Sequence, residues 1–380
     1  MPFHENEKAL TLGVEMELQV LDAHSLLLTP RAQEIIDTLS GKKVKHEFFQ
    51  STVEAVTGVC KDVHQVNDDL SETLAQLKGV SSKFNLKLSS TGTHPEADYR
   101  DRLVTPSKRY HELMDRNQWI IRRMAVYGMH IHIGMPSGDE CIKFHNFFLH
   151  FVPHVLALSA SSPFWQKIHT GLAASRPTMY EAMPTSGMPH IVKTWHGFEK
   201  MYRRMVLTKA IKSMRDLWLD LRPSPHLGTL EIRVCDEPAT LSEGLAITAF
   251  VHALAHWYQA NKEEWEGTHK KLYPWIFREN KWRAIRHGLN GDLIQPKTNQ
   301  MLSIRHHIFL WIEKLNPWIR QLGYDRYFAT LEDILNYGNS SDRQLAVFQR
   351  SENLHDVVIH CVGEFEKGIP NWINGTLNKV

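Results

Sequence analysis

The chain has 380 residues, of which 42% are hydrophobic and 23% are charged, with a formal net charge of +2. This is ordinary globular composition, with enough chain for one large domain or two. A nearly neutral chain lacks the broad basic field that binds polyanions, so we expect no nucleic-acid and no membrane partner. The N-terminal segment has no apolar stretch of the signal-peptide kind, which predicts a cytoplasmic protein.

The first third of the chain alternates between strand and helix patterns. Apolar residues at every second position predict a strand over residues 9–21, followed by a turn and a short strand at 26–28. Residues 44–60 have the composition of another strand. Asp62 should then cap a helix, because apolar residues recur after it every three or four positions up to Val80.

The middle of the chain continues this alternation. We expect a strand over 86–93, a helix over 108–126, a strand at 128–134 and a long helix over 139–161. Residues 170–190 differ, since glycine, proline, serine and threonine dominate there. A long irregular stretch within a compact domain favours a functional lid or binding loop over a packed structural excursion.

The last third of the chain is mostly helical in pattern. A capping box at 240–243 begins a helix that should end near residue 259, and helical periodicity prevails after 262. Strands before residue 235 with helices between and after them predict an α+β fold, with a mainly antiparallel sheet backed by helices on one face. We expect a sheet with its covering helices over residues 1–260, and a helical C-terminal region over 261–380 packed on the same domain.

Three of the predicted strands carry ionisable side chains at positions i and i+2. The pairs are Glu15 with Glu17, His130 with His132, and Glu231 with Arg233. Alternate residues of a strand point to one face, so each pair shares a face. A single acidic pair also fits a solvated strand face, and the HxH pair alone also fits zinc or a structural role. Three such pairs together favour a common site with cations, because clustered carboxylates otherwise repel one another.

The residue types indicate which ion and which ligand the site would take. Mg²⁺ prefers oxygen ligands and commonly links protein carboxylates to substrate phosphates. Oxygen ligands are available from Glu15, Glu17, Glu54 and Glu231. His130 would add a nitrogen that Mg²⁺, or more readily Mn²⁺, accepts, and His132 or Arg233 would contact phosphate oxygens. The pattern therefore predicts an ATP-binding face.

Seven motifs carry a resemblance to a known family. They are GVEMEL at 13–18, QSTVEAVTG at 50–58, TGTHP at 91–95, GMHIHIG at 128–134, SSPFW at 161–165, TGLAASR at 170–176 and GTLEIRVCDEP at 228–238. In this order they resemble the carboxylate–amine ligases related to glutamate–cysteine ligase, type 2, over residues 10–260. Since that family is similar in its catalytic sheet to glutamine synthetase, the resemblance implies a glutamine synthetase/glutamate–cysteine ligase-like fold.

The resemblance also implies roles for the paired residues. One divalent ion would be held by Glu15, His130 and Glu231, and the other by Glu17 and Glu54, with Glu47 as a further ligand. Glu47 and Glu54 have opposite strand parity, so Glu47 would need a bulge or bend to face the same ions. His132 and Arg233 would contact the ATP phosphates, with Arg233 stabilising charge on the transferred group.

The activity implied is ATP-dependent ligation. ATP would phosphorylate the γ-carboxylate of glutamate, and an amine would displace phosphate from the acyl phosphate. With cysteine as the amine, the products are γ-glutamylcysteine, ADP and phosphate, although cysteine ligation could be a weak side activity and the amine could be another compound. A zinc hydrolase and a non-catalytic nucleotide-binding module are the alternatives; the hydrolase is disfavoured because the chain has no HExxH helix.

Five residues are candidates for substrate contacts. They are Thr93, His94, Arg109, Arg176 and Arg222. Arginine pairs bidentately with carboxylates, which suits the α-carboxylate of glutamate. A surface salt bridge fits Arg109 equally well. The sequence leaves open the acceptor amine, the preferred metal, and whether the protein forms a homo-oligomer.

Overall fold

The computed structural model describes the chain except for residues 1, 6–9, 40–42, 269–270 and 373–380. Its centre is a seven-stranded sheet, in which the strand order is β10-β11-β5-β1-β3-β2 and β4 also pairs with β1. The strands are β1 Leu12–Asp22, β2 Val44–His46, β3 Thr52–Val56, β4 Leu86–Ser89, β5 Met129–Gly134, β10 Leu221–Ser224 and β11 Thr229–Ile232. All pairings in this sheet are antiparallel, as the sequence predicts.

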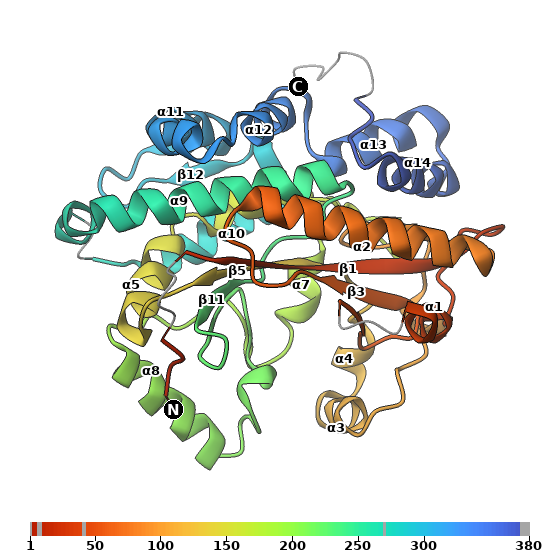
Figure 1. Ribbon diagram of the computed structural model, residues 1–380, viewed down its shortest axis with the longest axis horizontal. Coiled ribbons are helices and arrows are strands. Elements are labelled where there is room, and N and C mark those ends of the chain that lie inside the picture. The colour runs from red at the N-terminus through yellow and green to blue at the C-terminus, as the bar shows by residue number, and fades with distance from the viewer. Residues whose placement is uncertain (1, 6–9, 40–42, 269–270, 373–380) are drawn as a thin grey trace.

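Helices cover one face of the sheet, and shorter elements flank the other (Figure 1). The helices are α1 Ala32–Leu39, α2 Val63–Lys83, α3 Lys108–Asn117, α4 Trp119–Arg122, α5 Gly138–Phe148, α6 Val152–Ser159, α7 Arg176–Tyr180, α8 Trp195–Leu207, α9 Leu241–Thr268, α10 Pro274–His287, α11 Ile304–Leu322, α12 Asp325–Tyr337, α13 Ser340–Ser351 and α14 Leu354–Lys367. The short strands are β6 Phe164–Trp165, β7 Ile168–His169, β8 Ser186–Gly187, β9 Trp218–Leu219, β12 Asp292–Ile294 and β13 Met301–Ser303. The α+β expectation is confirmed.

The hydrophobic core lies between the sheet and the helices α2, α5 and α9. Alternate strand residues such as Val14, Met16 and Ile131 are fully buried there, while their neighbours face the opposite side of the sheet. The same core includes residues of α11, α12 and α14. The helical C-terminal region is therefore packed on the sheet domain.

Several predicted elements are divided or extended in the structure. The predicted strand over 44–60 becomes β2 and β3, because the chain turns between them. The predicted helix over 108–126 breaks at Gln118, whose φ of 50° is not helical. The helix over 139–161 becomes α5 and α6, since Pro153 in the first turn of α6 has no N–H to continue the earlier helix. Asp62 caps α2 as expected, with its side chain accepting from the N–H of Gln65.

The C-terminal third differs from its prediction in two ways. Helix α9 ends at Thr268 rather than near 259, so the proposed division at residue 260 falls inside a continuous helix. A small hairpin, β12–β13, interrupts the helices of the C-terminal region. No described helix is long and apolar enough to cross a membrane.

Candidate active site

The register of the sheet explains why the ionisable pairs converge. Directly opposite residues on neighbouring strands are Glu15 and His130, Glu231 and His132, and Glu17 and Glu54. Residues opposite one another on antiparallel strands point to the same face. The i,i+2 spacing within each strand and this register between strands place all of these side chains on the face opposite the core.

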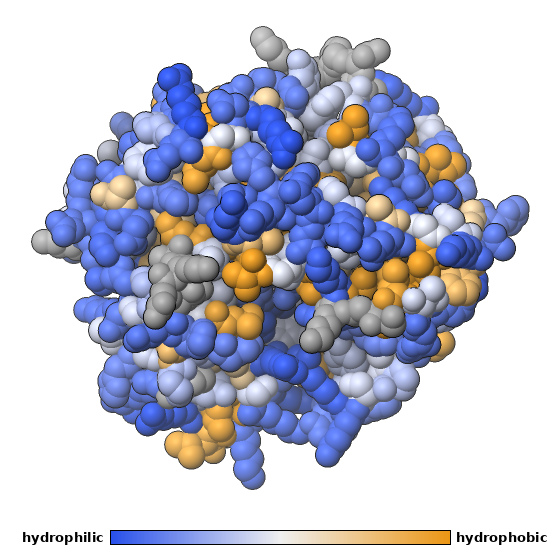
Figure 2. All heavy atoms as spheres, in the orientation of Figure 1, coloured by the Kyte–Doolittle hydropathy of each residue, from blue (hydrophilic) through white to orange (hydrophobic). Residues whose placement is uncertain are grey.

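A cavity of about 520 Å³ lies against this face. Figure 2 shows the molecule hollowed near the middle of the side facing the viewer, below the strands seen in Figure 1. Among the lining residues are Glu15, Glu17, Glu47, Glu54, His130, His132, Arg109, Arg176, Arg222, Glu231 and Arg233. The cavity therefore collects the paired residues together with most of the predicted substrate contacts.

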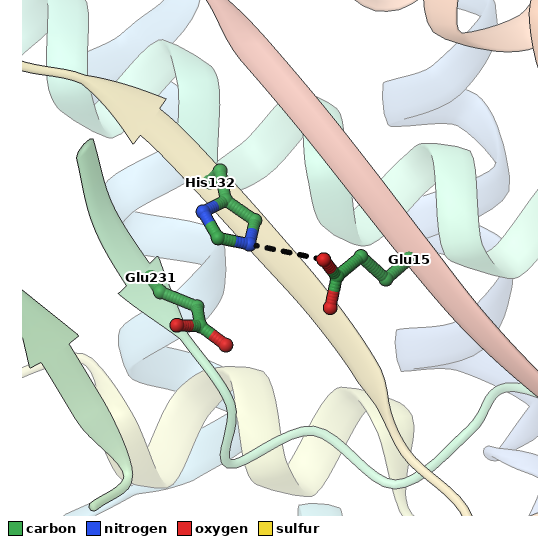
Figure 3. A group of neighbouring side chains, drawn as sticks. All are labelled: Glu15, His132 and Glu231. Atoms are coloured by element: carbon green, nitrogen blue, oxygen red, sulfur yellow. Dashed lines mark ion pairs between the residues drawn. The ribbon is translucent and has the colours of Figure 1, made fainter. Parts of the chain in front are cut away.

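Two groups of side chains have the geometry of a cation site. One group is Glu15, His132 and Glu231, which Figure 3 shows converging from three strands, and the other is Glu15, Glu54 and His130. In each group the candidate ligand atoms lie within 4.8 Å of one another. The Nε2 atoms of His130 and His132 are buried and have no hydrogen-bond partner among the described residues. Each Nε2 instead faces a carboxylate, His132 facing Glu15 at 3.5 Å (dashed in Figure 3) and His130 facing Glu17 at 4.0 Å. Carboxylate oxygens and imidazole nitrogens are suitable ligands for Mg²⁺ or Mn²⁺.

These groups differ from the ligand sets that the resemblance implies. Glu231 was expected to share an ion with His130, but in the structure it groups with His132, its direct partner across β5 and β11. His130 instead groups with Glu54. The resemblance assigns His130 to a metal and His132 to the ATP phosphates, and these separate roles stay predictions.

Glu47 reaches the cavity through the turn between β2 and β3. Residues 47–51 do not continue the strand, so the parity difference between Glu47 and Glu54 does not separate them. The expected bend is present. A role of Glu47 as a metal ligand stays a prediction.

The carboxylates of the cluster are held in proximity against their mutual repulsion. Burial and the charge of Glu47 raise the pKa of Glu17 to about 8. Burial and the same neighbour raise the pKa of Glu54 well above its usual value. Such shifts mean that extra negative charge is unfavourable here unless positive charge enters the cavity. The cluster therefore fits a divalent cation.

Arginine side chains border the carboxylates. Arg222 donates two hydrogen bonds to Glu231, of 2.8 Å from Nε and 3.0 Å from Nη2, and Arg233 pairs with the same carboxylate. Burial alone would raise the pKa of Glu231. The guanidinium groups of Arg233 and Arg222 nevertheless hold this pKa below its usual range. Arg176 donates to the backbone carbonyl of Arg233 at 3.3 Å. The site thus contains cations that can neutralise several anionic groups of a ligand.

Two predicted substrate contacts lie elsewhere. The Thr93 hydroxyl donates to the carbonyl of Phe164 at 2.7 Å, and Nε2 of His94 lies 2.9 Å from the carbonyl of Leu26. Both residues are buried and neither lines the cavity. Their side chains hold neighbouring loops together, and we leave them out of the proposed site.

Residues 170–190 are more ordered than the sequence suggests. The segment contains α7 and β8, and most of α7 is buried. It supplies Arg176 and Tyr180 to the cavity wall. Movement of this segment as a lid stays a prediction.

Three residues around the cavity were not predicted from the sequence: Glu237, Asp220 and Lys281. Glu237 accepts the backbone N–H of Glu17 at 2.9 Å, and Asp220 accepts the hydroxyl of Tyr180 at 2.7 Å. Lys281 of α10 then pairs with Asp220 at 2.5 Å. An acidic residue after an ionisable strand could have singled out Glu237, whereas nothing in the helical pattern around Lys281 sets it apart.

A comparison with models of protein families identifies the family of this chain. The model of glutamate–cysteine ligase family 2 matches residues 11–360. The chain belongs to this family. Two relatives, both provisionally named glutamate–cysteine ligase 2, come from Gloeobacter violaceus and Bdellovibrio bacteriovorus. They are 40% and 38% identical over 374 residues, which cover 97% of this chain and 99% and 98% of theirs.

Solved structures with low sequence identity share the fold of this family. The glutamate–cysteine ligase of Francisella tularensis, solved in complex with AMP, aligns with a TM-score of 0.66 and 11% identity, covering 96% of this chain and 90% of that one. A bifunctional glutathione synthetase from Pasteurella multocida aligns with a TM-score of 0.70 and 13% identity, covering 95% of this chain and 52% of that one. Membership in glutamate–cysteine ligase family 2 makes the protein an ATP-dependent ligase, and the hydrolase and binding-module alternatives are not supported.

Proposed function

We propose that the protein activates the γ-carboxylate of glutamate with ATP and joins it to a primary amine. The observation that carries this proposal is the cavity in which Glu15 belongs to two cation groups directly beside Arg222 and Arg233. Phosphoryl transfer to a carboxylate needs positive charge around the transferred group rather than a protein nucleophile. Cations placed next to carboxylate ligands meet this need.

The chemistry has two steps that this site would serve. A γ-carboxylate oxygen of glutamate attacks the terminal phosphorus of ATP, the bond to the ADP oxygen breaks, and an acyl phosphate forms. The amine nitrogen then bonds to the acyl carbon, the carbon–oxygen bond to phosphate breaks, and the amine proton leaves with the phosphate. The products are a γ-glutamyl amide, ADP and phosphate.

The chain's own residues have distinct roles in this scheme. Mg²⁺ or Mn²⁺, held by the two cation groups and with Glu17 and Glu47 beside them, would neutralise charge on the phosphates of bound ATP. Arg233 stabilises the charge on the transferred phosphoryl group, and Arg222 holds Glu231 in place. Arg176 pairs with the α-carboxylate of glutamate, and Arg109, at the exposed rim, is a second candidate for a substrate carboxylate.

The acceptor amine would bind beside the metal face. With cysteine, the product is γ-glutamylcysteine, and this activity could be a minor one because an acceptor pocket can change without altering the metal face. Buried, unpaired cysteines among the described residues fit the predicted cytoplasmic location. That location and a homo-oligomeric state stay predictions.

The proposal is tested by ADP release with glutamate, Mg²⁺ and a panel of primary amines that includes cysteine, together with the mass of the product. We expect ADP release that requires both glutamate and an amine, and a product with the mass of the γ-glutamyl amide. Leu207→Ala, at an exposed position of α8, is a matched control that should behave like the wild type. ADP release without any glutamyl product from the panel would contradict the proposal.

A further inference from the structure

One end of the cavity is walled by apolar side chains. This aromatic wall consists of Phe48, Phe49, Tyr110, Leu113 and Met124. All five belong to a hydrophobic cluster that is separate from the main core. Phe48 packs edge-on against both Phe49 and Tyr110, with ring centroids 4.7 Å and 5.4 Å away. The wall is a packed surface that faces the cavity beside β2 and β3.

The opposite end of the cavity is cationic. At β10 and directly after β11, Arg222 and Arg233 share the single carboxylate of Glu231, which leaves net positive charge at this end. The side chain of Arg222 is 15% exposed. At the wall end the cations are Lys45 and Arg109; both are exposed, and Lys45 faces Glu54 at 3.7 Å. The triphosphate of ATP is therefore better accommodated toward β10.

The geometry of phosphoryl transfer then places the other substrates. In an in-line displacement the attacking and leaving oxygens lie on opposite sides of the transferred phosphorus. With the cation groups of β1, β3, β5 and β11 around the transferred phosphate and ADP toward β10, the attacking γ-carboxylate comes from the opposite side, toward β3 and β2. The amine attacks that same carboxyl carbon, so it also approaches from the half of the cavity that contains the aromatic wall.

We propose that the acceptor is a primary amine carrying an aromatic or bulky apolar group, which packs on Phe48, Tyr110 and Met124. The inference rests on the proposed function and adds the chemical class of the amine. Burying apolar surface favours such a group over a small or polar one. The edges and faces of Phe48 and Tyr110 also offer aromatic packing to a ring. A small polar amine would cover less of the half-buried side chains of Tyr110 and Met124.

The test compares primary amines with and without an aromatic group in the wild-type protein. With saturating glutamate, ATP and Mg²⁺, kcat/KM is measured for phenethylamine, tyramine, ethylamine, ethanolamine and cysteine. We expect the two aromatic amines to exceed ethylamine and ethanolamine by at least about tenfold. Equal or higher values for ethanolamine or cysteine overturn the inference but leave the proposed function intact. If no amine yields a glutamyl product, the proposed function fails as well.

Substitutions of Tyr110 test whether the aromatic wall causes the preference for aromatic amines. Tyr110→Ala should lower the ratio of kcat/KM for phenethylamine to kcat/KM for ethylamine about tenfold, without raising the KM for ATP. Tyr110→Leu keeps an apolar side chain and should recover part of the loss, which also shows that the site still folds. Leu207→Ala is the control for an apolar residue outside the cavity. An increased KM for ATP in Tyr110→Ala, with unchanged amine preference, would assign the wall to the nucleotide and overturn the inference.

Discussion

Arg233 both pairs with Glu231 and is the proposed partner of the transferred phosphoryl group. Its guanidinium pairs with Glu231 and lies 3.5 Å from Nδ1 of His130, so it borders both cation groups. Glu231 raises the pKa of Arg233 further above its already high value despite burial, so the group is charged at every working pH. In the proposed reaction, a fixed positive charge at this point would stabilise the transition state of phosphoryl transfer more than it stabilises bound substrate.

Arg233→Ala is therefore expected to lower kcat about a hundredfold, equivalent to about 3 kcal/mol of transition-state stabilisation, with a small change in the KM for the amine. Steady-state kinetics of ADP release measure both constants. Arg100→Ala removes an exposed arginine that pairs with nearby Asp98, outside the cavity, and is the matched control. A large increase in KM with unchanged kcat would show instead that Arg233 contributes only to ground-state binding.

Glu15 is the carboxylate that the two cation groups share. Its removal should weaken both groups, whereas removal of Glu54 affects one. We expect Glu15→Gln to lower the affinity for Mn²⁺ by at least tenfold, and Glu54→Gln to lower it less. Calorimetric titration of the protein with Mn²⁺ measures this without reference to turnover. If wild type and Glu15→Gln bind Mn²⁺ with equal affinity, Glu15 is not a metal ligand.

The residues of this site show what a sequence can predict. The i,i+2 spacing placed each pair on one face correctly, because side-chain alternation is a local property of a strand. The assignment of His130 and His132 to their groups depended on register between strands that are far apart in the sequence. Thr93 and His94 lie within a recognisable motif, but their hydrogen bonds to Phe164 and Leu26 could be seen only in the folded chain.

At the scale of elements, a buried lysine of α10 pairs with two carboxylates beside the cavity wall. Lys281 of α10 pairs with Asp220, between β9 and β10, and with Glu181 after α7. Its side chain is 3% exposed and that of Asp220 is fully buried. Asp220 in turn accepts the Tyr180 hydroxyl at the cavity wall. Through Lys281, the C-terminal region therefore supports a wall of the site.

We expect Lys281→Met to reduce the free energy of unfolding by about 3 kcal/mol, because it leaves a buried carboxylate without its partner. Chemical denaturation followed by fluorescence measures the change. Lys200→Met, on the exposed face of α8, removes a lysine without breaking such a pair and should change stability little. A loss as small as that of the control would mean that water or a second cation compensates Asp220.

The boundaries of elements were predictable only where a residue enforces them locally. Asp62 begins α2 because its side chain accepts an N–H that the helix leaves unpaired. Pro153 divides α5 from α6, and proline could have signalled this break in the sequence. The turn between β2 and β3 has no proline or glycine within residues 47–51. The turn therefore arises from packing. Strand parity alone did not predict where this turn places Glu47.

At the scale of the whole molecule, one hydrophobic core connects both predicted regions. It extends from Leu12 of β1 to Phe365 of α14, and α9 runs through the proposed boundary at residue 260 without a break. A core shared in this way favours cooperative unfolding of sheet and C-terminal helices. A change in the charge of a buried group in either region should therefore affect the stability of the entire chain.

Buried histidines provide such groups. Burial lowers the pKa of His94 and His145 to about 4, and that of His252 to about 3. An unfolded chain holds these side chains near their ordinary value of 6.5. Between these values the unfolded chain binds more protons than the folded one, so stability is full above pH 6.5 and falls as the pH drops toward 4. Asp236 opposes this trend, since burial raises its pKa to about 6.

The contribution of one histidine can be isolated with His145→Gln. His145 lies on α5 away from the cavity lining, and its Nδ1 is 3.1 Å from Oδ1 of Asn146. A shift from 6.5 to about 4 costs the wild type about 2 kcal/mol between pH 7 and pH 5, a loss that the glutamine variant does not suffer. The stability difference between the two proteins, measured by denaturation at both pH values, should therefore move by that amount in favour of the variant. His196→Gln, at an exposed position, should show no such movement. A constant difference for His145→Gln would mean that the imidazole takes up its proton in the folded state, which requires water or an acid to reach it within the core.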